Sequence, residues 1–133
     1  MQAIRYTLAT IAHFGQSPRV DVARPSAIGN RKVGLVLTGV VVQRKREGIL
    51  VIISGHGPFK YIAMSWDPFR LILDFPGGRS SLSFHELQVN GVILKRIRIG
   101  EHEDTLRLVF DLAQRVRYAV KEGINFMAVQ FKP

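Results

Sequence analysis

Apolar and polar residues alternate strictly along two short segments in the second half of the chain, residues 94–99 and 106–112. Successive side chains of a β-strand point to opposite faces of a sheet. Each segment therefore has one apolar face, formed by isoleucines in the first segment and by leucines and a phenylalanine in the second. The pattern predicts a half-buried antiparallel hairpin. The other face of this hairpin carries Arg96, Arg98, Arg107 and Asp111.

An imperfect copy of the second segment lies 37 positions upstream. Residues 70–75 read Arg-Leu-Ile-Leu-Asp-Phe, and residues 107–112 read Arg-Leu-Val-Phe-Asp-Leu. In the strands that precede these copies, Tyr61 aligns with Arg96. Such self-similarity indicates two related structural halves within one domain.

Two further pairs of apolar segments predict hairpins, and a turn containing Glu-Gly joins the members of each pair. The pairs are residues 33–43 with 49–54 and residues 116–121 with 125–131. With residues 59–65 and a weakly alternating piece in 79–92, the chain has about eight or nine strands at spacings of roughly 8–12 residues. No long helical period interrupts them. The sequence therefore predicts an all-β sandwich of two similar, roughly four-stranded antiparallel sheets with an internal pseudo-repeat.

Residues 1–32 differ from the rest of the chain. Glycine, proline, serine and asparagine punctuate this segment, and no hydrophobic period persists in it. We expect a flexible or linker-like lead-in over residues 1–32 and a single β-sandwich domain over residues 33–133. No convincing secretory signal is recognised at the start of the sequence.

Composition narrows the classes of partner. The 133 residues carry a formal net charge of +9, spread along the chain, which favours nucleic acid, anionic lipid or an acidic wall polymer as partners. The absence of cysteine excludes disulfides, thiolate metal sites and a cysteine nucleophile. No two histidines have metal-ligand spacing, so no metal or other cofactor is expected. No apolar run approaches the ~18 residues of a membrane-spanning helix, so no membrane span is expected.

The repeated strands carry a resemblance to a known family. Residues 70–77, Arg-Leu-Ile-Leu-Asp-Phe-Pro-Gly, resemble the signature strand of the AMIN domain family. Residues 97–100 followed by 107–112 are also similar to that family, and so is Tyr118 with residues 125–129. The resemblance covers about residues 33–132, and the order and spacing of the pieces make it specific.

The resemblance implies a fold and a role. AMIN domains are small β-sandwiches in exported bacterial envelope proteins, found at the N-terminus of cell-wall amidases and of type IV pilus secretins. They localise the parent protein by binding peptidoglycan and are not themselves catalytic. The chain is therefore expected to be non-enzymatic and to act in the periplasm or cell envelope, either as an excised fragment or as a stand-alone module.

The arginines of the central hairpin are the candidate ligand-binding residues. Like charges directly opposite one another destabilise a sheet by ~0.2–1 kcal/mol, so acidic residues or an anionic ligand must offset them. Arginine binds carboxylates in bidentate fashion, and peptidoglycan stem peptides carry free carboxylates. We hypothesise that the wall-binding surface comprises Arg96, Arg98, Arg107 and Arg117, with Asp111 as the balancing acid. An ordinary solvated basic face is the alternative.

Two other features carry weaker hypotheses. Trp66, expected at a hairpin tip, would either stack on a sugar ring or pack over the end of the sandwich. Arg70 and Asp74, like Arg107 and Asp111, lie four residues apart, ~13 Å along a strand, so each should pair instead with a neighbouring strand. Paired carboxylates also suggest glycoside hydrolysis, but the internal repeat explains both aspartates without catalysis.

The sequence thus predicts a non-catalytic module that binds peptidoglycan and localises a bacterial cell-envelope protein of the amidase or secretin type. One alternative is a protein-docking domain that meets a pilus or divisome partner through an exposed sheet edge. A nucleic-acid-binding module is suggested by charge alone. It is disfavoured because the chain lacks the interleaved aromatic and basic residues of a stacking platform.

Overall fold

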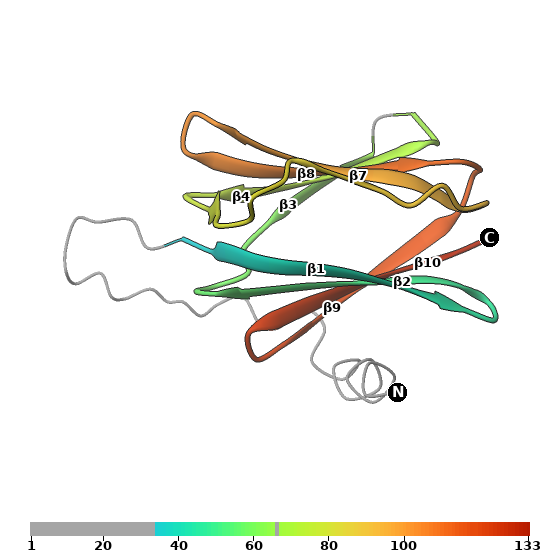
Figure 1. Cartoon of the computed structure of the whole chain (residues 1–133), viewed down its shortest axis with the longest axis horizontal. Coiled ribbons are helices and arrows are strands. Elements are labelled where there is room, and N and C mark those ends of the chain that lie inside the picture. Colours follow the sequence, from blue (N-terminus) through green and yellow to red (C-terminus); the bar gives the residue numbers. More distant parts are fainter. Residues whose placement is uncertain (1–33, 66) are drawn as a thin grey trace.

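The computed structural model describes residues 34–65 and 67–133, which form two five-stranded sheets packed face to face (Figure 1). The ten strands are β1 (Val36–Lys45), β2 (Gly48–His56), β3 (Ile62–Ser65), β4 (Arg70–Pro76), β5 (Arg79–Ser80), β6 (Glu86–Gln88), β7 (Leu94–His102), β8 (Thr105–Leu112), β9 (Arg117–Gly123) and β10 (Phe126–Lys132). The predicted all-β sandwich is confirmed.

Each half of the repeat supplies one hairpin to each sheet. The first sheet has the order β5-β1-β2-β10-β9, and the second has the order β3-β4-β8-β7-β6. The predicted four-stranded sheets correspond to β1-β2-β10-β9 and β3-β4-β8-β7. The segment between β4 and β7 adds one short edge strand to each of them. β5 pairs with β1 in parallel, and the other pairings are antiparallel.

The core lies between the two sheets and follows the alternation of the sequence. Leu71, Leu73 and Phe75 on β4 point inward and are nearly inaccessible to solvent. The rings of Phe110 on β8 and Phe131 on β10 meet across the two sheets, with centroids 5.5 Å apart. Burial of a side chain of this size contributes roughly 1.5–3 kcal/mol, so this interface is the main source of stability.

The two copies of the repeated strand pair with each other at the centre of the second sheet. In the antiparallel register of β4 and β8, Arg70 lies opposite Asp111 and Asp74 lies opposite Arg107. Ile72 lies opposite Val109, so a local two-fold axis passes between these two residues. A two-fold rotation therefore relates the two copies of the repeated strand in the structure.

Two details of the predicted repeat are wrong. Asp74 faces Ile62 on β3, whereas Asp111 faces Arg96 on β7, so the counterpart of Arg96 is Ile62. Tyr61 instead packs against the core beside Phe75. The loop between β3 and β4 is longer than the loop between β7 and β8. An alignment of the two copies by sequence alone therefore misses the correct correspondence between β3 and β7. The prediction that a Glu-Gly dipeptide lies in each hairpin turn is also wrong. Glu47 lies in the β1–β2 turn, but the second dipeptide ends with Gly123, the last residue of β9, and so precedes its turn.

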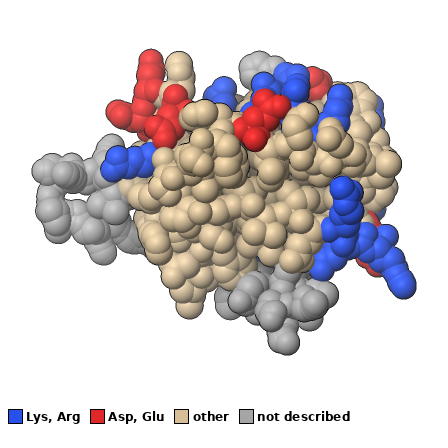
Figure 2. All heavy atoms as spheres, in the orientation of Figure 1, with Lys and Arg blue, Asp and Glu red and all other residues tan. Residues whose placement is uncertain are grey.

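Charged side chains are unevenly distributed over the sandwich. Figure 2 shows basic side chains gathered at the end that holds the β1–β2 turn, and acidic side chains at the opposite end. The acidic group belongs to the β7–β8 turn, which contains Glu103 and Asp104. Between them the face in view is largely uncharged, so the molecule has distinct charged regions.

Candidate functional site

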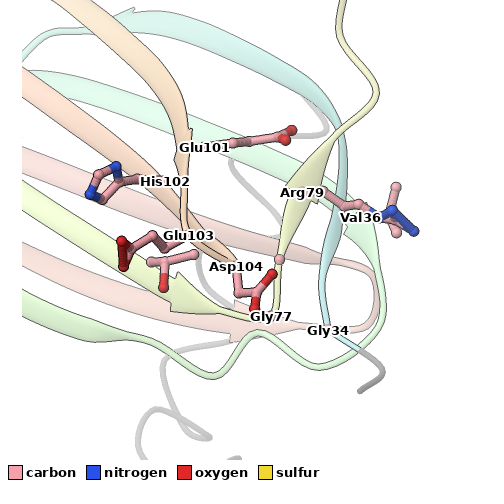
Figure 3. Close-up of a pocket in the computed structure, with 10 residues that line it drawn as sticks. Gly34, Val36, Gly77, Arg79, Glu101, His102, Glu103 and Asp104 are labelled. Atoms are coloured by element: carbon pink, nitrogen blue, oxygen red, sulfur yellow. The ribbon is translucent and has the colours of Figure 1, made fainter. Parts of the chain in front are cut away.

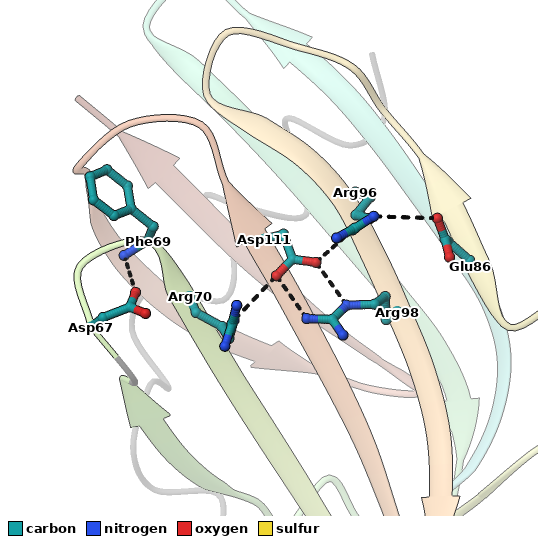
Figure 4. A network of polar contacts seen from close by, with 7 residues as sticks. All are labelled: Asp67, Phe69, Arg70, Glu86, Arg96, Arg98 and Asp111. Carbon is teal, nitrogen blue, oxygen red and sulfur yellow. Dashed lines mark hydrogen bonds and ion pairs between the residues drawn. The ribbon is translucent and has the colours of Figure 1, made fainter.

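A single buried carboxylate organises the outer face of the second sheet. Asp111 lies near the end of β8, a central strand, and the neighbouring strands β4 and β7 place arginines beside it (Figure 4). Arg70 Nε donates to Asp111 Oδ1 at 3.3 Å, and Arg96 Nε donates to Oδ2 at 2.8 Å. Arg98 approaches in bidentate fashion, with Nε 2.7 Å from Oδ2 and Nη2 2.9 Å from Oδ1. We call these four residues the Asp111 cluster.

The carboxylate of the Asp111 cluster is buried and its arginines are not. The Asp111 side chain is 8% exposed, whereas the side chains of Arg70, Arg96 and Arg98 are 43%, 43% and 40% exposed. Burial alone would raise the pKa of Asp111, but hydrogen bonds from Arg98 and Arg96 and their positive charges outweigh it and lower this pKa. Asp111 is therefore a fixed negative charge that accepts hydrogen bonds from the buried side of three guanidinium groups.

The cluster carries more positive than negative charge. Three guanidinium groups surround one carboxylate, and the further acid within reach is Glu86 on β6, whose Oε2 lies 3.9 Å from Arg96 Nη1. A guanidinium has five N–H donors. Because the contacts to Asp111 and Glu86 use only some of these donors, the exposed edges of the arginines retain capacity for an anion.

A second ion pair lies on the same face. Arg107 donates from Nε and Nη2 to the two carboxylate oxygens of Asp74, at 2.8 and 2.9 Å. Ile72 and Val109 lie between this pair and the Asp111 cluster and are nearly buried, at 5% and 9% exposure. The surface therefore has an apolar centre with arginine groups on either side.

The structure brings together four of the predicted ligand-binding residues and separates one. Arg96, Arg98, Arg107 and Asp111 share the outer face of the second sheet. Arg117 lies on β9 of the first sheet, opposite Lys132. Trp66 lies outside the described residues, as does the predicted lead-in over residues 1–32. The expectation that each Arg–Asp pair forms across neighbouring strands is confirmed.

Sequence reasoning missed Arg70 and Glu86 as members of this site. From the sequence, Arg70 is expected to pair with a neighbouring strand, but it is not among the predicted ligand-binding residues. Its signal was nevertheless present, since an antiparallel pairing of the two copies places Arg70 opposite Asp111. Glu86 lies on a three-residue strand whose sequence gives no comparable signal.

Comparison with known families decides the kind of domain. The family model of the AMIN domain matches residues 39–131, which covers most of the chain and includes every strand of the Asp111 cluster. The chain belongs to the AMIN domain family. A search of curated proteins finds no match.

The AMIN domain has a pocket at its acidic end, away from the Asp111 cluster (Figure 3). The pocket has a volume of about 770 Å³ and lies between the β7–β8 turn and the start of β1. Glu101 Oε2 accepts a hydrogen bond from the backbone N–H of Ser80 at 2.8 Å, which holds this carboxylate in place. Gly34 is required at the pocket wall, because a Cβ there would lie 2.1 Å from the Gly77 carbonyl oxygen.

The described part of the AMIN domain offers no metal site or helical membrane span. Over residues 34–65 and 67–133, no three acidic or histidine side chains are grouped so as to hold a metal ion. The same residues include no helix that is long and apolar enough to cross a membrane.

Proposed function

We propose that this AMIN domain is a non-catalytic module that binds peptidoglycan and localises a bacterial cell-envelope protein of the amidase or secretin type. Membership of the family supports the peptidoglycan ligand and an envelope location. The observation that carries the proposal is the excess of exposed guanidinium groups around one buried carboxylate.

The Asp111 cluster suits a carboxylate ligand. Asp111 binds the inner edges of its arginines and so fixes the direction in which their outer edges point (Figure 4). Preorganised arginines lose less side-chain entropy when they bind, which favours a weak ligand. A stem-peptide carboxylate would accept paired N–H donors from Arg96 and Arg98, or from Arg70 and Arg98, in the fork geometry that arginine favours.

The apolar centre of this face complements the charged contacts. Ile72 and Val109 provide a small surface on which the apolar side of a peptide or sugar would rest. Contacts of this kind are individually weak, but a polymer offers many copies of the same ligand. Binding therefore raises the local concentration of the parent protein at the wall without any chemical step.

The two aspartates of this face are poorly suited to acid–base catalysis. Asp74 accepts two hydrogen bonds from Arg107, and Asp111 accepts hydrogen bonds from three arginines. The low pKa of Asp111 keeps it ionised near neutral pH, whereas a general acid needs a raised pKa. This arrangement supports a binding role.

The test is co-sedimentation of the chain with isolated peptidoglycan sacculi. The informative variant is Arg70→Gln with Arg96→Gln, because Arg98 then still holds Asp111 through two hydrogen bonds. Reversal to glutamate is less suitable, since a new carboxylate would face Asp111 directly. The matched control is Lys60→Gln with Arg79→Gln, which removes the same charge from exposed positions at the other end of the sandwich.

The expected result is that wild type and control pellet with sacculi near about 150 mM salt, whereas the Arg70/Arg96 variant does not. Duplex and single-stranded DNA are tested in parallel. Equal pelleting of all three proteins would contradict the assignment of this face. Binding to DNA alone, with a steep dependence on salt, would contradict the wall ligand altogether.

A further inference from the structure

One end of the sandwich combines basic and exposed apolar residues, and the peptidoglycan proposal does not use it. The β1–β2, β3–β4 and β6–β7 turns and the β8–β9 connection all lie at this end, together with the last residues of β10 (Figure 1). We define its cations as the basic end. They are Arg44, Lys45, Arg46, Lys95, Arg115, Arg117 and Lys132.

Few acidic residues offset the positive charge of the basic end. The turns themselves contain two acidic residues, Glu47 and Asp67. Among residues 34–65 and 67–133, the one ion pair that involves a cation of this end joins Lys132 Nζ to Glu47 Oε1 at 3.9 Å. This contrasts with the outer face of the second sheet, where Asp111 and Asp74 accept hydrogen bonds from the arginines. Figure 2 shows the resulting concentration of basic side chains around the β1–β2 turn.

Exposed apolar residues accompany these cations. Val92 in the β6–β7 turn is 77% exposed, and Phe69 beside β4 is 46% exposed. Hydrogen bonds hold the Val92 turn in place: the Gly91 N–H donates to the Leu94 carbonyl oxygen, and Gln114 Nε2 donates to the Val92 carbonyl oxygen, both at 2.9 Å. Arg44 Nη1 lies 3.3 Å from the position that a Cβ would take on the neighbouring Gly91. The turn thus presents an apolar side chain beside a guanidinium.

We propose that the basic end docks the domain onto an anionic phospholipid surface. Lysine and arginine are attracted to the negative surface of such a membrane, and apolar side chains at loop tips enter the boundary between headgroups and acyl chains. A soluble polyanion would use the cations but would gain nothing from Val92 and Phe69. The pairing of both residue types on fixed turns therefore favours a lipid surface over nucleic acid or an acidic glycan.

The proposal is independent of the peptidoglycan ligand. The Asp111 cluster lies on the outer face of the second sheet and borders this end, since Arg70 directly follows Phe69. Arg44 and Arg46, by contrast, lie at the β1–β2 turn of the first sheet. Different variants therefore disable the two surfaces. Failure of the peptidoglycan proposal appears as a loss of binding to sacculi, and failure of the lipid proposal appears in the experiments with vesicles.

The experiment is co-sedimentation of the full chain with vesicles of phosphatidylglycerol and phosphatidylethanolamine, with phosphatidylcholine vesicles as the uncharged reference. Near about 150 mM salt, wild type should pellet with the anionic vesicles and not with the reference. Arg44→Gln with Arg46→Gln should weaken this binding about 20- to 30-fold, since each cation near the surface contributes about five-fold. Both residues are exposed, so the variant should melt near the wild-type temperature.

Two further variants separate the lipid surface from general charge. Lys60→Gln with Arg79→Gln removes the same charge from the opposite end and should change binding less than about two-fold, since those residues lie beyond a Debye length from the membrane. Val92→Ser keeps all charges and should weaken vesicle binding several-fold while leaving any duplex DNA binding unchanged. Neither double variant should be impaired on sacculi.

Three results would overturn the proposal. The first is an absence of wild-type binding to anionic vesicles, or equal binding to the uncharged reference. The second is an equal loss for the Arg44/Arg46 and Lys60/Arg79 variants, which would show that only net charge matters. The third is unchanged vesicle binding by Val92→Ser together with full competition by duplex DNA, which would define a general polyanion surface.

Discussion

Arg107 binds Asp74 through two hydrogen bonds across the junction of β4 and β8, at 2.8 and 2.9 Å. The local two-fold axis of the second sheet relates this pair to Arg70 and Asp111, which meet at 3.3 Å. The same six-residue pattern thus produces both ion pairs. They differ because β7 adds two arginines to Asp111, whereas β3 places Ile62 beside Asp74. One aspartate has become the centre of a cationic surface, and the other has remained a structural partner.

Replacement of Asp111 should be the more destabilising of the two aspartate substitutions. Asp111→Asn leaves three arginines facing a neutral group. It should lower the free energy of unfolding by about 2–3 kcal/mol, less than the ~3–5 kcal/mol of a fully buried pair because the arginines reach solvent. Asp74→Asn affects one arginine and should cost about 1–2 kcal/mol. Urea unfolding at neutral pH measures both values, and a larger loss for Asp74→Asn would contradict the central role of Asp111.

Stability should fall in acid through Asp111. The pKa of Asp111 is lower in the folded protein than its ordinary value of about 3.9, so the folded state binds the proton less readily than the unfolded chain does. The contribution of this carboxylate is therefore complete above about pH 4–5 and is lost as the pH falls through its folded-state value. Urea unfolding of wild type and Asp111→Asn at neutral pH and near about pH 3 should show their difference shrinking. A difference that stays constant with pH would contradict this assignment.

Arg117 provides a separate test of where peptidoglycan binds. The structure places Arg117 on the first sheet, away from the Asp111 cluster. Arg117→Gln should therefore leave pelleting with sacculi within about two-fold of wild type, because the exposed edges of the cluster are unchanged. Arg96→Gln removes the same charge and should weaken binding more, with co-sedimentation as the readout. A greater loss for Arg117→Gln would move the ligand to the first sheet.

Two glycines, one in each sheet, should differ in their tolerance of a methyl group. A Cβ at Gly48, where β2 begins, would lie 2.0 Å from the backbone oxygen of Phe131 on β10, so Gly48→Ala must push the two strands apart. We expect a loss of about 1–3 kcal/mol in the free energy of unfolding. A Cβ at Gly100 meets nothing within 4 Å, so Gly100→Ala should change stability by no more than about 0.5 kcal/mol. Thermal unfolding of both variants tests the packing at β2 and β10.

Most of the long strands were predictable from the sequence because one of their faces packs against the core. The alternation around Phe110 and the repeated pattern over residues 70–75 predicted the sandwich and its duplication. The pairing of each arginine with an aspartate on the neighbouring strand also followed from strand geometry, since residues four apart on one strand cannot meet. Regular alternation therefore carries enough information to specify layers and faces.

The site was less predictable because register and sheet membership are not local properties. The one-residue error at Tyr61 arose from loops of different length, and a slip of one residue moves a side chain to the other face. Arg117 was placed with the other arginines although the chain crosses to the first sheet before β9. The convergence of three arginines on Asp111 required the order of β4, β8 and β7, which no single segment encodes.

Each half of the chain supplies one hairpin to each sheet, and this arrangement also governs how the domain folds. The central pairing of the first sheet joins Leu50 to Gln130, and the central pairing of the second joins Ile72 to Val109. Both sheets are completed only when distant parts of the chain meet, and such non-local closure makes folding slow, on the order of milliseconds to seconds. Neither half encloses a core of its own, so a truncated chain would leave apolar sheet faces open to water. Folding should therefore be all-or-none, with both sheets closing in one cooperative transition.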